Sequence, residues 1–431
     1  MLTASMIITL VIVIAMIVAI ISDKLPFGAP PLIACALLVV TNQATVAQAF
    51  GGFVDKNVIM IAGFMAAMAA LQKTSFISSL KRALGNMAGK GGYKNYVLLL
   101  LMIMLIANFI TGTAYYVLIL SIVSTIPYNK KLPTSRIILP AGMATGFGGW
   151  IPISTAFFVG LMSSLLESSG AAGATVSLTQ FTIYRAIVSV LFLVWALIGY
   201  KLLPDRDISD TLADAQKVDL AKEEKHELTK FQEISVYVGF VIMIAGMILL
   251  GKLPNEVGYG IPAVIAAIFL CVGALKFKEL LGNWFSPLIV MMAGVIGVAT
   301  AMSNCGLTAL LGEKIVGLLG TAPSPFLVVL VFSFITSISA TFTGASFGSL
   351  FIFAPIGIAA CMQLGYNPVA LAFALVPIAW INWAMPIDGL PAMIMGLGKY
   401  KLTEFWKFQV PLWIIQVVAT AAIAVALFPM K

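Results

Sequence analysis

Apolar segments recur along the whole chain and are separated by short polar or charged stretches. A helix needs about 20 apolar residues to cross a bilayer. Segments of about that length fall at 4–22, 27–42, 57–72 and 180–203, and again at 234–251, 259–275, 286–303 and 408–428. Four longer apolar regions lie between them, at 95–127, 137–167, 324–363 and 367–396. The pattern predicts an all-α polytopic membrane protein with about ten spanning helices.

One segment in each half has a different, amphipathic character. Residues 72–94 contain five basic residues and no acid, and their apolar residues recur at helical spacing from Phe76 to Leu84. Such a helix lies in the plane of the membrane interface. Residues 304–320 occupy the corresponding place in the second half and are predicted to lie in the same way.

Two of the long apolar regions carry a Thr-Gly step near their middle. It is Thr111-Gly112-Thr113 in the region 95–127 and Thr343-Gly344-Ala345 in the region 324–363. Glycine is a poor helix former, and an opened backbone inside a membrane persists only where it is buried in protein or lines a wet cavity. Both regions are therefore predicted to be re-entrant hairpins with these residues at their tips.

The other two long regions carry glycine and proline instead. Proline removes a backbone donor and glycine lets the backbone unwind, so each region is predicted to be a discontinuous helix. Ordinary kinks remain the alternative. The interrupting residues are Gly146, Gly148, Gly149 and Pro152 in 137–167, and Pro386, Gly389 and Pro391 in 367–396.

These landmarks recur in the same order in the two halves at a nearly constant distance. Gly63 matches Gly294, Leu80 matches Leu311, Gly112 matches Gly344 and Pro152 matches Pro386, at separations of 231, 231, 232 and 234 residues. An ordered set of this kind indicates duplication. The chain is predicted to consist of two inverted repeats, 1–203 and 234–431, joined by a charged linker at 204–233.

Composition agrees with the apolar pattern. The chain has 431 residues, of which 61% are hydrophobic and 10% charged, and its mean hydropathy is +1.06. Soluble domains carry roughly 25% charged residues. The net charge of +8 could indicate a nucleic-acid partner, but no basic run is interleaved with aromatic residues. Cytoplasmic loops of membrane proteins collect Lys and Arg, so the expected partner is the lipid bilayer.

The same rule gives an orientation. The basic stretches 72–94 and 129–136 and the linker 204–233 are predicted to be cytoplasmic, and the uncharged stretch 168–180 external. Both termini are then outside and the two hairpins enter from opposite sides of a bacterial-type inner membrane. Arg185, at the outer end of its segment, is an exception. The first 22 residues lack a basic n-region and are predicted to be a spanning helix and not a removed signal.

Residues for enzymatic or metal chemistry are scarce. The four cysteines are scattered without metal-ligand spacing, and the single histidine, His226, lies in the linker. No nucleophile–base pair is visible, so we predict neither an enzyme nor a bound cofactor. Sodium or a proton is expected only as a coupling ion.

The hairpin tips and helix breaks are the expected binding site. Half-helix N-termini favour anions, and unwound carbonyl oxygens favour cations such as sodium. Asp388 is the acid that lies within an apolar segment away from its ends, and it could ligate sodium, carry a proton or pair with a cation. Alternatively, each Thr-Gly is a packing notch, in which the helices approach closely and the Thr hydroxyl bonds back to its own helix. Asp388 would then be exposed to cytoplasmic water. Trp150, Trp380 and Trp383 lie near the breaks and are expected to serve packing or gating rather than to form a ligand cage.

Four motifs resemble the divalent-anion:sodium symporter family of the ion transporter superfamily. They are Asn108–Tyr116 at the first tip, Gly148-Gly149 through Ser154-Thr155, Met385–Pro391, and Gly51-Gly52-Phe53 through Thr74. The resemblance implies an elevator transporter, a homodimer, that moves di- or tricarboxylates or sulfate with sodium. The chain differs in lacking the tip Asn and the Pro-Pro-Asn of that family, and in having Asp388.

The resemblance also implies site residues. The substrate, a small anion, would lie between Thr111, Gly112, Thr113, Pro152, Ser154 and Thr155 of the first half and Thr343, Gly344, Ala345, Pro386 and Gly389 of the second. Sodium would bind at Thr111, Gly148 and Gly149, and at Thr343, Ser346 and the region of Asp388. The role of Asp388 as coupling residue is expected from its acid within an apolar segment and not from the resemblance.

Three functions remain in competition at this point. The first is a cation-coupled secondary transporter of a small organic anion. The second is a cation/proton antiporter of the same superfamily that exchanges through Asp388. The third is the large membrane subunit of a binding-protein-dependent, ATP-independent carrier, which would need two further proteins.

Overall fold

The computed structural model contains α-helices and short 3₁₀ turns, with no strand in the residues that it describes. These are 3–22, 24–26, 28–86, 92–110, 113–124, 126, 132–171, 174, 176–206, 208, 228–249, 253, 256–319, 323–343, 346–386 and 389–430. Of the predicted site residues, Thr111, Gly112, Gly344, Ala345 and Asp388 lie outside this set, as do most of the linker and His226.

In its described residues, the first half forms ten helices and two 3₁₀ turns. They are α1 (Ala4–Ser22), α2 (Ala29–Val40), α3 (Val46–Ala49), η1 (Gly51–Val54), α4 (Lys56–Leu71), α5 (Ser75–Gly85), α6 (Tyr93–Ile106), α7 (Thr113–Ser124), α8 (Thr134–Ala144), α9 (Pro152–Ser168), α10 (Leu178–Gly199) and η2 (Tyr200–Leu202). The chain bends by 68° between α4 and α5, where the sequence predicted a change from a spanning to an interfacial helix.

The second half repeats this order. Its helices are α12 (Lys230–Ile248), α13 (Val257–Cys271), α14 (Phe277–Trp284), α15 (Pro287–Asn304), α16 (Leu307–Leu319), α17 (Pro325–Thr343), α18 (Ser346–Gln363), α19 (Val369–Ala379), α20 (Gly389–Leu397) and α21 (Leu402–Leu427). The long region 137–167 is interrupted between α8 and α9, and the region 367–396 between α19 and α20. Both interruptions fall at the predicted glycines and prolines.

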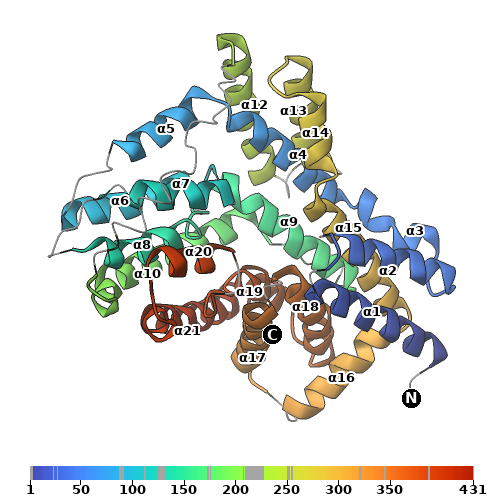
Figure 1. Ribbon diagram of the computed structural model, residues 1–431. Coiled ribbons are helices and arrows are strands. Elements are labelled where there is room, and N and C mark those ends of the chain that lie inside the picture. Colours follow the sequence, from blue (N-terminus) through green and yellow to red (C-terminus); the bar gives the residue numbers. More distant parts are fainter. Residues whose placement is uncertain are drawn as a thin grey trace.

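The two halves pack against each other in a reciprocal way. Helix α4 lies against α13, and α15 lies against α2 (Figure 1). A Cβ added at Gly63 would lie 2.4 Å from the backbone nitrogen of Ala263, beside Pro262, and one added at Gly294 would lie 2.7 Å from Cβ of Pro31. The two glycines and the two prolines are each 231 residues apart, so the same contact occurs twice. The repeat boundaries themselves stay a prediction.

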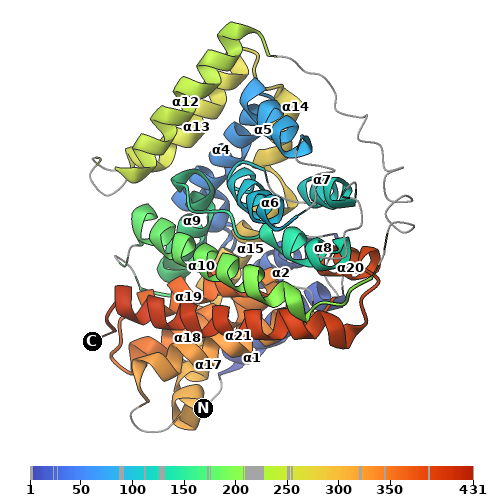
Figure 2. The same cartoon turned by 90° about the vertical axis from the view of Figure 1, so that its left-hand side faces the viewer.

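Six described helical segments are long and apolar enough to cross a membrane, or seven if the bent α4–α5 pair counts as one span. They are 178–202, 230–248, 277–304, 325–343, 346–363 and 402–427. The prediction of about ten also counted shorter apolar helices, such as α2 and α13. Both legs of the second hairpin, α17 and α18, are long enough to span. Figure 2 shows α10 beside α21, and α12 beside α13.

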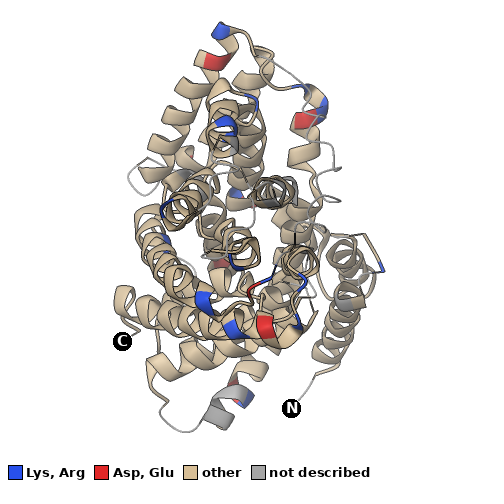
Figure 3. Ribbon diagram, turned by 60° about the vertical axis from the view of Figure 1, so that its left-hand side comes forward, with Lys and Arg blue, Asp and Glu red and all other residues tan. Residues whose placement is uncertain are grey.

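Charged residues are few along the ribbon (Figure 3). Helix α4 has a lysine ion pair at each end: Lys56 Nζ lies 3.3 Å from a Glu167 carboxylate oxygen, and Lys73 Nζ lies 2.5 Å from one of Glu279. On α10, the exposed residues Ile183, Ile187 and Val190 recur at helical spacing. Exposed apolar faces between charged ends are expected where lipid surrounds the helices.

Candidate functional site

The break between α8 and α9, residues 145–151, is held by the first hairpin. The Asn108 Oδ1 accepts hydrogen bonds from the backbone N–H of Gly149 at 2.9 Å and of Ile151 at 3.0 Å. A Cβ added at Gly148 would lie 2.6 Å from the carbonyl carbon of Ala107, so glycine lets the two backbones meet. The end of α6 is therefore docked directly on the break.

Asn108 is itself fixed in place. Its side chain is fully buried, and its Nδ2 donates to the carbonyl oxygens of Met104 at 2.9 Å and Leu105 at 3.0 Å. The Tyr115 hydroxyl on α7 donates to the Ile103 carbonyl of α6 at 2.5 Å and joins the two legs of the hairpin. A buried backbone donor needs a partner, and Asn108 supplies one acceptor for two such donors.

The carbonyl oxygens of the same break are bound by α10. Arg185 donates from Nε to Gly148 O at 3.1 Å, and from Nη2 to Gly146 O at 2.8 Å and Gly148 O at 2.5 Å. The Ser189 hydroxyl donates to Phe147 O at 2.6 Å. Gly149 has φ +93°, and a Cβ there would lie 2.6 Å from Arg185 Nε. A guanidinium thus lies against the opened backbone of the first half.

The break between α19 and α20 is bound by neutral groups in its described part, 380–386. The Ser337 hydroxyl donates to Ile381 O at 2.6 Å, and Trp406 Nε1 donates to Ala384 O at 2.8 Å. Gln409 Nε2 lies 3.4 Å from Trp383 O. Trp413 Nε1 donates to the Ser337 hydroxyl at 2.6 Å and extends this network into α21.

The second hairpin meets this second break. Helix α17 ends at Thr343 and α18 begins at Ser346. Asn382 Nδ2 donates to the Ser346 hydroxyl at 3.2 Å. The Thr343 hydroxyl donates to the Ser339 carbonyl of its own helix at 2.7 Å, which is the geometry of a packing notch. The oxygen of a hydroxyl that already donates can still accept a hydrogen bond from a ligand.

The two breaks touch each other. A Cβ added at Gly146 would lie 2.3 Å from Cη2 of Trp383, and the rings of Phe147 and Trp383 meet edge to face with centroids 5.6 Å apart. Trp380, at the start of the second break, meets the rings of Phe158 on α9 at 5.4 Å and Phe347 on α18 at 4.7 Å. A continuous path of contacts therefore runs from the first hairpin, through both breaks, to the second hairpin.

The remaining predicted site residues have varied surroundings. Thr155 is fully buried, and its hydroxyl is 3.0 Å from Pro152 O and 3.2 Å from the Thr182 hydroxyl on α10. Pro152 begins α9, Ser154 lies in its first turn, Thr113 begins α7, Gly389 begins α20, and Pro386 lies in the second break. Gly148 and Gly149 contact the first hairpin and Ser346 contacts the second break. Their assignment to substrate or sodium stays a prediction.

Sequence reasoning gave Arg185 and Asn108 no role in the site. Arg185 attracted notice only because its charge did not fit the predicted orientation. The sequence contained a clearer signal. The charged residues of the apolar region 180–203 are Arg185 and, near its end, Lys201. A charge inside an apolar span is a functional hypothesis by default.

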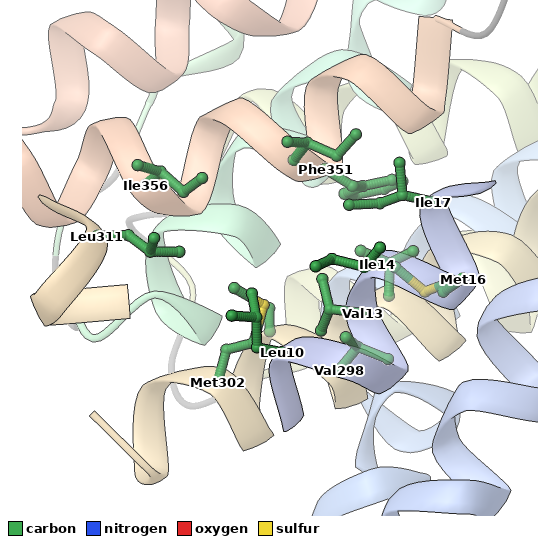
Figure 4. A pocket seen from close by; sticks show the side chains of 13 residues that line it. Leu10, Val13, Ile14, Met16, Ile17, Val298, Met302, Leu311, Phe351 and Ile356 are labelled. Atoms are coloured by element: carbon green, nitrogen blue, oxygen red, sulfur yellow. The ribbon is translucent and has the colours of Figure 1, made fainter. Parts of the chain in front are cut away.

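A separate cavity of about 140 Å³ lies between α1, α15, α16 and α18 (Figure 4). The side chains that line it, such as Leu10, Val298, Met302 and Phe351, are apolar. Carboxylates lose their hydration in such surroundings without compensation, so this cavity is not suited to the predicted anion. In the described ranges, His, Cys, Asp and Glu form no group of three or more that could hold a metal ion.

The fold is that of known membrane transporters. The Alcanivorax borkumensis YdaH transporter superposes with a TM-score of 0.63 at 16% identity, over 90% of this chain and 88% of that one. Neisseria gonorrhoeae MtrF, described as illuminating a class of antimetabolite efflux pumps, superposes with a TM-score of 0.57 at 15% identity, over 99% and 96%. At such identities the likeness concerns the fold.

The chain belongs to the citrate transporter (CitMHS) family, whose family model matches residues 17–281. It is accordingly an integral membrane protein of a transporter family and not an enzyme. The uncharacterized transporter sll0640 of Synechocystis is 27% identical over 202 residues, and the uncharacterized transporter YfbS of Escherichia coli 22% over 191. These matches cover 47% and 44% of this chain but only 32% and 30% of the relatives, about a third of their length. The matched family differs from the divalent-anion:sodium symporters that the motifs resemble.

Proposed function

We propose that the protein is a secondary transporter that moves a small organic anion, a tri- or dicarboxylate such as citrate, coupled to sodium or protons. The observation that carries the proposal is the path of contacts from one hairpin, through both helix breaks, to the other hairpin. In secondary transporters the substrate binds where such discontinuous helices of two repeats meet. The name of the matched family supports a tricarboxylate as the first substrate to test.

An elevator mechanism is part of this proposal. The close contacts of Gly63 with Pro262 and Ala263, and of Gly294 with Pro31, leave no room for a side chain. Contacts of this kind suit a rigid frame built from α2, α4, α13 and α15. The hairpins and the broken helices would form the part that moves past this frame with its anion.

Uptake by purified protein in liposomes tests the proposal. Labelled citrate, succinate or sulfate is offered under an imposed sodium gradient, an imposed proton gradient, or neither. We expect accumulation of at least one carboxylate, and faster accumulation under one of the two gradients. Uptake that is indifferent to every cation gradient would contradict coupling, and sodium–proton exchange without any organic anion would favour the antiporter.

A pair of asparagine variants then locates the site. Asn382→Ala removes the donor that joins the second break to Ser346. Asn283→Ala removes an amide that donates to the Glu279 carbonyl of its own helix α14, away from both breaks. The substrate concentration for half-maximal uptake should rise in Asn382→Ala and stay unchanged in Asn283→Ala. Equal effects would place the site elsewhere.

A further inference from the structure

The most unusual group in the apolar part of the molecule is the guanidinium of Arg185. The helix that carries it, α10, belongs to a segment long and apolar enough to span a membrane. In the described part of the chain, no carboxylate forms a salt bridge with Arg185. Its hydrogen-bond partners are the Gly146 and Gly148 carbonyl oxygens, and its Cζ lies 5.9 Å from the centre of the Phe158 ring.

Backbone carbonyl oxygens of unwound helices are also the ligands with which transporters bind sodium. The Gly148 carbonyl oxygen, in the pair of residues predicted as sodium ligands, accepts two hydrogen bonds from the guanidinium, at 2.5 and 3.1 Å. A sodium ion bound to the same oxygen would lie a few ångströms from a permanent positive charge. Two like charges so close in a region of low dielectric constant repel each other strongly.

We propose that Arg185 is a tethered cation that takes the place of a coupling ion at the first break. Arginine stays protonated at any physiological pH, so this charge is permanent. The inference rests on the proposed cation-coupled transport, and it fixes where the mobile cation binds. The mobile coupling cation then binds at the second break alone. The protein moves one cation fewer per substrate than it would if each break bound a cation.

The second half supports this division. In the described part of its break, 380–386, the carbonyl oxygens accept from Ser337, Trp406 and Gln409, all of them neutral. Residues 408–427 of α21, the counterpart of α10, contain no basic residue, and the lysine of this helix, Lys407, lies before them. The two breaks therefore have the same architecture, but only the first carries a built-in charge in the described residues.

Chemical rescue provides the direct test. Arg185→Ala removes the guanidinium and leaves a space of its shape beside the Gly146 and Gly148 carbonyls. We expect the apparent melting temperature of this variant in detergent, without substrate, to be lower than that of the wild type. Millimolar methylguanidinium, or sodium in place of choline at fixed ionic strength, should raise it again by more than it raises the wild type. Arg136→Ala is the matched control, because Arg136 also donates to a backbone carbonyl, that of Leu203 at 2.9 Å, but outside the breaks.

Charge movement provides a second readout, on variants that keep the packing. The reversal potential of transport gives the number of cations per substrate. Arg185→Gln is expected to move one cation more per substrate than the wild type, and Arg185→Lys to keep the wild-type number. An unchanged number in Arg185→Gln, or rescue of Arg136→Ala to the same degree as Arg185→Ala, overturns the tethered cation.

The two proposals fail in different ways. If the wild-type protein moves no carboxylate, the proposed function is wrong, and the melting-temperature rescue of Arg185→Ala still reports on the first break. If the wild type moves a carboxylate but Arg185→Ala responds to neither methylguanidinium nor sodium, Arg185 only stabilises the break.

Discussion

The two helix breaks have the same place in their halves but differ in what binds their carbonyl oxygens. In the first break, Arg185 and Ser189 of α10 donate to three successive carbonyls, from Gly146 to Gly148. In the second, hydroxyl, indole and amide donors bind Ile381, Trp383 and Ala384. Duplication provides two similar backbones, and later substitution of a few side chains can give them different electrostatics. The electrostatic difference between the two breaks therefore comes from the side chains of α10 and α21.

A second difference concerns the way each hairpin is held. The first is docked by one asparagine whose oxygen accepts two backbone N–H groups, with glycine allowing direct backbone contact. In the described part of the second hairpin and its break, Asn382 donates to the Ser346 hydroxyl. Among the described residues, the first hairpin thus contacts its break through backbone groups, and the second through side chains.

Removal of the asparagine that docks the first hairpin should have the largest effect. Asn108→Ala leaves the N–H groups of Gly149 and Ile151 without their acceptor. Each unsatisfied buried donor costs about 1–3 kcal/mol, so we expect a loss of roughly 2–6 kcal/mol and little remaining uptake. Thermal unfolding and liposome uptake measure the two effects.

The control for this change is Asn283→Ala, which removes a bond within a single helix. Its loss of stability should stay below about 1.5 kcal/mol, the net value of one hydrogen bond. A comparable loss in both variants would mean that the first hairpin is not held by Asn108.

The glycine with positive φ in the first break gives the next effect. Gly149→Ala imposes a Cβ at φ +93° and 2.6 Å from Arg185 Nε, so the guanidinium must move. Gly365→Ala is matched in backbone, with φ +71°, but its Cβ would meet open space. Left-handed backbone costs an L-residue about 1–2 kcal/mol.

Both alanine variants should therefore lose about 1–2 kcal/mol of stability through the backbone. Only Gly149→Ala should in addition change the cation dependence of uptake, because only this change displaces the guanidinium. An identical cation dependence in the two variants would separate Arg185 from coupling.

The sequence predicted the arrangement of helices better than the chemistry of the site. Helix ends follow from apolar length and from local signals: Ser177 and Thr229, for example, cap α10 and α12 with a glutamine three residues later. The breaks follow from glycine and proline. Each of these features depends on a few neighbouring residues and is therefore visible in one sequence.

The partners across the site are not local. Asn108 and Gly149 are 41 residues apart, Arg185 and Gly148 37, and Gly146 touches Trp383 across the whole linker. A single sequence shows that Arg185 is charged, but not that two glycine carbonyls accept from it. The close approach of the breaks depends on the packing of both halves and could not be predicted from either half alone.

The contact between the breaks should give an effect of about the same size as Gly149→Ala. Gly146→Ala places a Cβ 2.3 Å from Cη2 of Trp383, and this indole must rotate away. Overpacking of this kind costs about 1–3 kcal/mol. The double variant Gly146→Ala with Trp383→Phe should recover part of this loss, because the smaller ring leaves room. If the double variant recovers none of the lost stability, the two breaks are not in contact in the folded protein.

The smallest effect is expected at the second break, where the donors are neutral. Trp406→Phe removes the hydrogen bond to Ala384 O and leaves the carbonyl within reach of water, since Trp406 is 37% exposed. The loss should be about 0.5–1.5 kcal/mol. Trp195→Phe is the matched control, because Trp195 Nε1 donates to Phe408 O at 3.1 Å, outside both breaks. Similar losses of stability are expected from the two variants, with a changed sodium or proton dependence of uptake only in Trp406→Phe. If both variants keep the wild-type cation dependence while Arg185→Gln alters it, coupling depends on the first break, and the assignment of the mobile ion to the second break is wrong.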